Sequence, residues 1–140
     1  MSEQPAGLAG VLISTPEDRF EAMKAFYTGT LGLVPRSVRP GFVNFELAGG
    51  RLTIASHDRV VGVSRDPLRV MVNLAVSDLT EWHRRLTMAG VSCLRDPSPE
   101  PWGGQVATYS DPDGNTLQLM TGTAAADASL APVRPTSPPP

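Results

Sequence analysis

The chain repeats one pattern of strand, helix and hairpin, and this repetition limits its possible folds more than any other feature. The two predicted helices end alike, in Leu31-Gly32-Leu33 and in Ala89-Gly90-Val91, with an offset of 58 residues between the two glycines. Glycine readily takes the left-handed conformation that ends many helices. Residues 8–121 therefore divide into a first module at about 8–60 and a second at about 68–121.

Each module is predicted to contain a strand, an amphipathic helix and a hairpin, in that order. Thr15 and Pro16 mark the start of the first helix, and Asp78 with Glu81 forms the cap of the second. Short apolar or alternating runs predict the strands. These runs are 10–13, 42–47 and 51–55 in the first module and 70–76, 105–110 and 116–120 in the second, with further short strands near 34–38 and 92–95.

This order predicts an α+β fold in which two βαβββ modules pair into a curved mixed sheet with a central cleft. Both helices are expected outside the sheet. Because side chains alternate along a strand, the positions between the helix-facing residues should line the cleft. An amphipathic lining of this kind suits a small organic ligand. Its predicted members are Phe42, Asn44, Glu46, Arg51, Thr53, Ala55, Met71, Asn73, Ala75, Thr108, Thr116, Gln118 and Met120.

Composition excludes several classes of protein. Twelve basic against fourteen acidic residues leave no electrostatic footprint for nucleic acid or an anionic membrane. The single cysteine, Cys93, excludes an internal disulfide, and the Cys and His residues show no zinc-ligand spacing. With no basic leader and no long apolar run, we expect a cytoplasmic protein. Residues 1–7 are expected to form an N-terminal extension and residues 122–140 a disordered tail rich in proline and alanine.

Several short motifs occur in a characteristic order. They are Phe26-Tyr27 with Leu31-Gly32-Leu33, an alternating hairpin, Val76-Ser77-Asp78-Leu79, Ala89-Gly90-Val91, Trp102-Gly103-Gly104 and Asp111-Pro112-Asp113-Gly114-Asn115. Over about residues 8–121 this order resembles the vicinal oxygen chelate superfamily, which includes glyoxalase I, extradiol dioxygenases and bleomycin-binding resistance proteins. The resemblance implies paired βαβββ modules and, since small members usually associate in pairs, a homodimer.

Metal-dependent members of that superfamily carry the ion on His, Glu or Gln side chains of the cleft-facing strands. The matching positions here hold Gly10 or Val11, a residue near Thr53, Met71 and Gln118. Only Gln118 could ligate a hard divalent ion, and a catalytic site needs about three protein ligands and an open position. We therefore expect no metal ion and no other cofactor.

Glu46 is the strongest candidate for an acid or base, because it is the only carboxylate at a predicted cleft-facing strand position. Apolar neighbours would favour proton transfer near neutral pH, whereas Arg51 across the hairpin would make Glu46 part of a structural ion pair. Trp102, in a loop stiffened by prolines, is expected either to stack on a planar or cationic ligand or to pack the loop down.

Other reactive side chains are expected to be structural. His57, with an adjacent carboxylate, is predicted on a surface loop, with a base or metal-ligand role as the alternative. His83 is expected on the solvent side of its helix and Trp82 on the core side. Cys93 is expected to be an inert buried thiol, and the acids of Asp111–Asn115 are expected to shape a turn.

Three functions remain. The first is a metal-free protein that binds a small organic ligand, such as an aromatic natural product or antibiotic. Its predicted contacts are Phe42, Asn44, Thr53, Met71, Asn73, Trp102, Thr108 and Gln118. The second is a glyoxalase-like lyase, isomerase or hydrolase with Glu46 as the proton-transfer group. The third is an enzyme with an unusual metal site, of which His57 is the foremost candidate ligand.

Overall fold

A computed structural model describes residues 4–122, and the chain divides into two compact units between Gly62 and Val63. The predicted tail, apart from Gly122, lies outside the described residues. The first unit contains β1 (Gly10–Thr15), α1 (Phe20–Ala25), β2 (Ser37–Arg39), β3 (Phe42–Leu47) and β4 (Gly50–Ser56). The second contains β5 (Val72–Ala75), α2 (Leu79–Met88), β6 (Cys93–Pro99), β7 (Gln105–Ser110) and β8 (Thr116–Met120).

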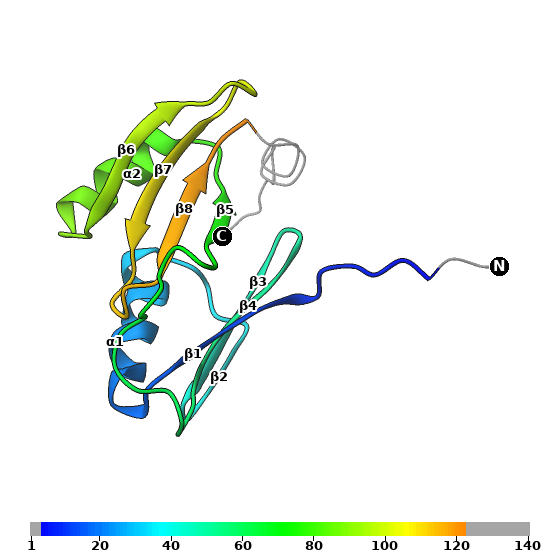
Figure 1. The fold of residues 1–140 in the computed structure, drawn as a ribbon, viewed down its shortest axis with the longest axis vertical. Helices are drawn as coiled ribbons and strands as arrows, with labels where there is room; N and C mark the ends of the chain where they lie inside the picture. Colours follow the sequence, from blue (N-terminus) through cyan, green and yellow to red (C-terminus); the bar gives the residue numbers. More distant parts are fainter. Residues whose placement is uncertain (1–3, 123–140) are drawn as a thin grey trace. The chain divides into compact units, whose positions relative to one another are not determined.

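The two sheets have the same topology. Their strand orders are β1-β4-β3-β2 and β5-β8-β7-β6. In each, the first and last strands of the module pair in parallel and the other pairs are antiparallel. Each helix lies against the sheet of its own module (Figure 1). The structure therefore confirms the α+β fold with two βαβββ modules.

The first helical segment is less regular than its sequence predicts. A 3₁₀ turn, η1 (Glu17–Arg19), precedes α1, and a π-helical turn, η2 (Phe26–Thr30), follows it. The wider π turn still places Phe26 and Tyr27 in the core, where the Phe26 ring packs edge-on against Tyr27 and the Tyr27 ring lies beside Phe45. Gly32 ends the segment with φ at 79°, which confirms the predicted termination signal.

Strand alternation separates two faces in the first sheet. Val43 pairs with Ile54 and Phe45 pairs with Leu52 in the register, and all four are buried on the face covered by the helix. Their neighbours in sequence point to the opposite face. We call that opposite surface the first helix-free face.

The second module has the same division. Asp78 caps α2 by accepting a hydrogen bond from the Glu81 amide at 3.1 Å, and Gly90 follows with φ at 80°. Both features agree with the sequence prediction. The helix buries Leu79 and Leu86 on the side of the second sheet that carries Leu74, Ala107, Tyr109, Leu117 and Leu119. The opposite surface of this sheet is the second helix-free face.

Three details differ from the sequence expectations. The first strand of the second module begins at Val72, so Met71 precedes β5 and is exposed. Trp82 is half-buried beneath the guanidinium of Arg85, 4.5 Å from its ring centroid, instead of lying in the core. Cation–π stacking keeps this indole at the helix surface. Strand β6 continues to Pro99, beyond the expected 92–95.

The turn between β7 and β8 is built around one buried carboxylate. Asp111 Oδ1 accepts hydrogen bonds from the amides of Asp113 and Asn115, each at 2.9 Å, and Oδ2 accepts from Asn115 Nδ2 at 3.0 Å. The amide of Ser64, in the segment that enters the second module, donates to the carbonyl of Asp113 at 2.8 Å. The predicted structural role of this turn is confirmed.

None of the helices within residues 4–122 has the length and apolar character needed to span a membrane.

Candidate functional site

Predicted site residues of the first module lie together on the first helix-free face. Asn44 stands opposite Thr53 in the β3–β4 register, Phe42 stands opposite Ala55, and Glu46 stands opposite Arg51. The face therefore changes along the hairpin from an aromatic residue, through a pair of neutral polar side chains, to charged ones.

Asn44 is the most unusual member of this face. Its side chain is nearly covered, with 5% of the residue exposed, and its Oδ1 atom is buried with no hydrogen-bond partner among the described residues. An unpaired buried acceptor typically costs about 1–3 kcal/mol of stability. Such atoms are uncommon in native structures, so this position requires an explanation.

Phe42 and Glu46 lie on either side of Asn44 along β3. The guanidinium of Arg39 lies 3.9 Å from the centroid of the Phe42 ring. The Glu46 carboxylate is 3.1 Å from Arg51 and 3.6 Å from Arg36, and 56% of its side chain is exposed. Glu46 thus sits among guanidinium groups at the surface, in the ion pair with Arg51 that the sequence offered as the alternative to an apolar environment.

The second helix-free face carries a polar row across three strands. Asn73 pairs with Gln118 and Gln118 pairs with Thr108 in the register, and Gln118 Nε2 donates to Thr108 Oγ1 at 3.2 Å. Arg95 on β6 continues the row and forms a 2.8 Å ion pair with Glu100. Met71 precedes β5 and has no partner in the β5–β8 register.

Trp102 packs its own loop down, which is one of the two roles predicted for it. A Cβ atom built on Gly104 would collide with the indole and with the carbonyl of Thr121, so the ring packs directly on a glycine backbone. Half of the residue nevertheless remains exposed. The indole is therefore held in place and still presents surface to solvent.

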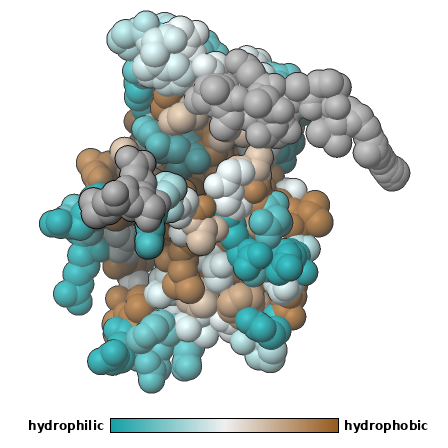
Figure 2. Space-filling model, turned by 90° about the vertical axis from the view of Figure 1, so that its right-hand side faces the viewer, coloured by the Kyte–Doolittle hydropathy of each residue, from teal (hydrophilic) through white to brown (hydrophobic). Residues whose placement is uncertain are grey.

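Apolar side chains accompany these polar ones at the surface. Leu12 of β1 stands beside Thr53 in the register and is exposed. Figure 2 shows hydrophobic residues in brown between hydrophilic ones in teal on the side of the molecule that it presents. The surface on that side is amphipathic.

The positions that carry the metal ion in the superfamily's metalloenzymes do not fit that ion here. Of Gly10, Thr53 and Gln118, only Gln118 offers a side-chain carbonyl oxygen to a hard cation. A Cβ atom on Gly10 would collide with the backbone carbonyl of Arg51, so that position has no room for a ligating side chain.

His57 lies in the loop after β4, where the sequence predicts it. Its Nδ1 atom accepts a hydrogen bond from the Arg59 amide at 3.1 Å and lies 3.5 Å from a carboxylate oxygen of Asp58. Both neighbours belong to the same exposed loop.

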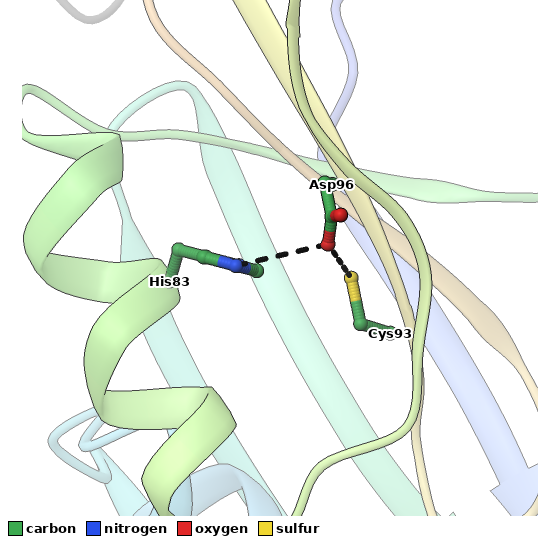
Figure 3. Close-up of side chains that lie close together, drawn as sticks. All are labelled: His83, Cys93 and Asp96. Carbon is green, nitrogen blue, oxygen red and sulfur yellow. Dashed lines mark hydrogen bonds and ion pairs between the residues drawn. The ribbon is translucent and has the colours of Figure 1, made fainter.

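The structure brings together three side chains that were not connected in the sequence analysis. His83 of α2 points toward Cys93 and Asp96 of β6, and ligand atoms of all three lie within 4.8 Å of one another (Figure 3). His83 is partly buried, with Nδ1 2.7 Å from the hydroxyl of Tyr109, and Cys93 is exposed. The expectations of a solvent-facing His83 and a buried Cys93 were therefore wrong, and the spacing of Cys and His along the chain gave no sign of this group.

A β-bulge explains why this grouping was missed. Cys93 pairs with Tyr109 and Arg95 pairs with Thr108. From the first pair to the second, β6 therefore moves on by two residues and β7 by only one, which is a β-bulge. In a regular strand, residues three apart point to opposite faces. The extra residue returns Asp96 to the face of Cys93. The only sequence signal of irregularity is the pair of prolines at 97 and 99.

The surroundings of this group of side chains shift the pKa values of Cys93 and Tyr109. Although the Cys93 side chain is exposed overall, partial desolvation of its sulfur, followed by the hydrogen bond to the Asp96 carboxylate, raises the pKa of the Cys93 thiol. Burial, followed by the charges of Cys93 and Asp96, raises the pKa of Tyr109 to about 12. Both groups therefore stay protonated at neutral pH in the absence of a bound cation.

Two βαβββ modules with an amphipathic helix-free face define the class of glyoxalase-like folds. A model of the Glyoxalase/Bleomycin resistance protein/Dioxygenase superfamily matches residues 13–119, and the chain belongs to this superfamily. The resemblance inferred from the motifs is thereby confirmed. A search of curated proteins finds no match to the chain.

Solved structures support the same fold at low sequence identity. A protein from Bacillus anthracis assigned to the glyoxalase family superposes with a TM-score of 0.71 at 20% identity, covering 88% of this chain and 100% of its own. A glyoxalase/bleomycin resistance protein/dioxygenase from Nocardioides gives 0.66 at 22% identity, covering 89% and 87%. Lactoylglutathione lyase from Agrobacterium tumefaciens gives 0.64 at 17% identity, covering 86% and 96%.

Proposed function

We propose that this chain binds a small organic ligand on its helix-free faces without using a metal ion there. The observation that carries the proposal is the buried, unpaired Oδ1 atom of Asn44. A ligand with a hydroxyl or N–H group supplies the missing hydrogen bond and removes the cost of burying that oxygen.

The surroundings of Asn44 favour a ligand that is partly aromatic. Phe42 lies two residues away on the same strand face, and Thr53 stands directly opposite. Independently of Asn44, Trp102 of the second module leaves part of its indole exposed, which is a separate aromatic surface for a planar ligand. Aromatic side chains stack on planar ligands and bind cationic groups over their faces. An aromatic natural product or antibiotic is the ligand class that matches these side chains.

The Asn44→Leu variant separates ligand binding from folding. Leucine has nearly the same size but no acceptor, so we expect stability to stay unchanged or to rise by about 1 kcal/mol. The affinity for the ligand should fall about tenfold, which corresponds to one lost hydrogen bond of about 1.4 kcal/mol. The ligand is first identified by screening aromatic natural products for an increase in Tm, and titration calorimetry then compares the two proteins.

Thr80→Ala, at an exposed position of α2, serves as the control and should change neither quantity. A large loss of stability in Asn44→Leu would show that Asn44 is a structural residue. Unchanged affinity for every ligand that stabilises the native chain would contradict the proposal.

The alternative function is a glyoxalase-like lyase or isomerase in which Glu46 transfers a proton. Its support is the position of Glu46 on the same strand face as Asn44, together with the fold shared with lactoylglutathione lyase. If this alternative is correct, Glu46→Gln will abolish turnover of a bound compound while leaving its affinity intact. Glu21→Gln, an exposed position of α1, is the matched control. Assays of the screened ligands for chemical conversion decide the question.

A further inference from the structure

We propose that His83, Cys93 and Asp96 form a binding site for a divalent transition-metal ion, with zinc as the occupant that the ligand set fits best. The site lies between α2 and β6 of the second module, on the helix-covered side of the sheet (Figure 3). It is therefore separate from the helix-free faces and from the positions that carry metal in other members of the superfamily.

The three donor atoms are already close together. Asp96 Oδ1 lies 3.4 Å from Cys93 Sγ and 3.8 Å from His83 Nε2. Ligands around a tetrahedral zinc ion lie at about 2.0–2.3 Å from the metal, which places neighbouring donor atoms about 3–4 Å apart. A cation can therefore enter between them with only small side-chain movements.

The bulge in β6 is the structural device that creates this arrangement. Without the extra residue between the Cys93 and Arg95 pairings, Asp96 would point to the helix-free face, away from His83. Bulges commonly re-aim side chains next to functional sites. The irregular strand thus brings two ligands from one strand to one side.

Tyr109 orients the histidine. Its hydroxyl lies 2.7 Å from His83 Nδ1, so the opposite ring nitrogen, Nε2, faces Asp96. Metal-ligating histidines almost always bond their second ring nitrogen to a neighbouring polar group, which fixes the ring and its tautomer. With an ion bound, Nδ1 donates its proton in the hydrogen bond to Tyr109, and Nε2 binds the metal.

The donor chemistry selects the ion. One imidazole nitrogen, one thiolate and one carboxylate are all common zinc ligands, whereas magnesium and calcium prefer oxygen donors only. Three protein ligands leave the fourth position to water. The Asp96 side chain is 85% exposed, so ions can reach the site from solvent.

Binding of cobalt(II) gives a specific signal for this site. Cys93 is the only cysteine in the chain, so a near-ultraviolet thiolate-to-cobalt charge-transfer band can come from no other residue. We expect the native chain, without an affinity tag and under reducing conditions, to bind about one cobalt ion with this band. Zinc should displace the cobalt and raise the Tm, since an ion that binds the native state stabilises it.

Two variants and one control test the assignment. Cys93→Ser should lose the band, and Asp96→Asn should lower zinc affinity by more than about tenfold, because loss of even a second-shell partner costs about 10- to 100-fold. Both positions are exposed, so the variants should fold, and their metal-free Tm values verify this. His57→Asn alters the only other histidine and should keep the band and the affinity.

Absence of the band at saturating cobalt would overturn the proposal. So would zinc affinity that is equal in the native chain and in Asp96→Asn. Neither result would bear on ligand binding at Asn44, because that residue belongs to the other module.

Discussion

Phe45→Ala is expected to lower the free energy of unfolding by about 4 kcal/mol. The Phe45 ring is fully buried on the helix-covered face of the first sheet and packs beside Tyr27, with their ring centroids 6.5 Å apart. Truncation removes its transfer free energy and leaves a cavity that a rigid sheet cannot close. Urea titration followed by circular dichroism measures the loss, and the Tm should fall by on the order of 10 °C or more.

Phe42→Ala is the matched control on the same strand. Phe42 lies on the opposite face and is only partly buried, so its truncation should cost about 1 kcal/mol. Phe42→Ala should also lower the affinity for the proposed ligand. Phe45→Leu, in contrast, should leave that affinity unchanged and lower the stability only a little. If both alanine substitutions lowered the free energy of unfolding equally, the assignment of Phe45 to the buried face and Phe42 to the opposite face would be wrong.

Asp111→Ala is expected to cost about 3 kcal/mol. The substitution removes the acceptor of two amides in the β7–β8 turn and of the Asn115 side chain. A buried amide left without a partner costs about 1–3 kcal/mol. Thermal unfolding should show the decrease directly. The parallel β5–β8 pairing should weaken with it, because β8 begins immediately after this turn.

Two further variants test whether the expected loss of stability in Asp111→Ala comes from the hydrogen bonds of the turn. Asp111→Asn retains a carbonyl acceptor and should recover part of the loss. Asp58→Ala removes a carboxylate whose side chain is 82% exposed, and it should stay within about 0.5 kcal/mol of the native chain. A similar Tm for Asp111→Ala and Asp58→Ala would contradict the structural role of the turn.

Local sequence signals predicted most of the fold. The Asp78 cap and the two helix-terminating glycines act over a few residues, and the structure confirms them. Strand alternation also assigned Asn44 and Thr53 to one face correctly. The π-helical turn at Phe26–Thr30 was not foreseen, although it includes two adjacent aromatic residues that are both buried.

Sites that depend on tertiary geometry were harder to predict. Glu46 has two arginine neighbours, and one of them, Arg36, comes from the loop before β2, whose course the sequence does not reveal. The group of His83, Cys93 and Asp96 depends on a bulge that changes which face Asp96 occupies. Periodicity reports the face of a residue only while a strand stays regular.

The irregular β6 also determines how the second sheet meets other molecules. It is an edge strand, interrupted by two register shifts and by Pro97 and Pro99, which lack amide protons. Exposed regular edges recruit strands from other chains, and bulges and prolines prevent this. Copies of this chain at high concentration should therefore not join edge to edge through β6, and the second sheet ends there.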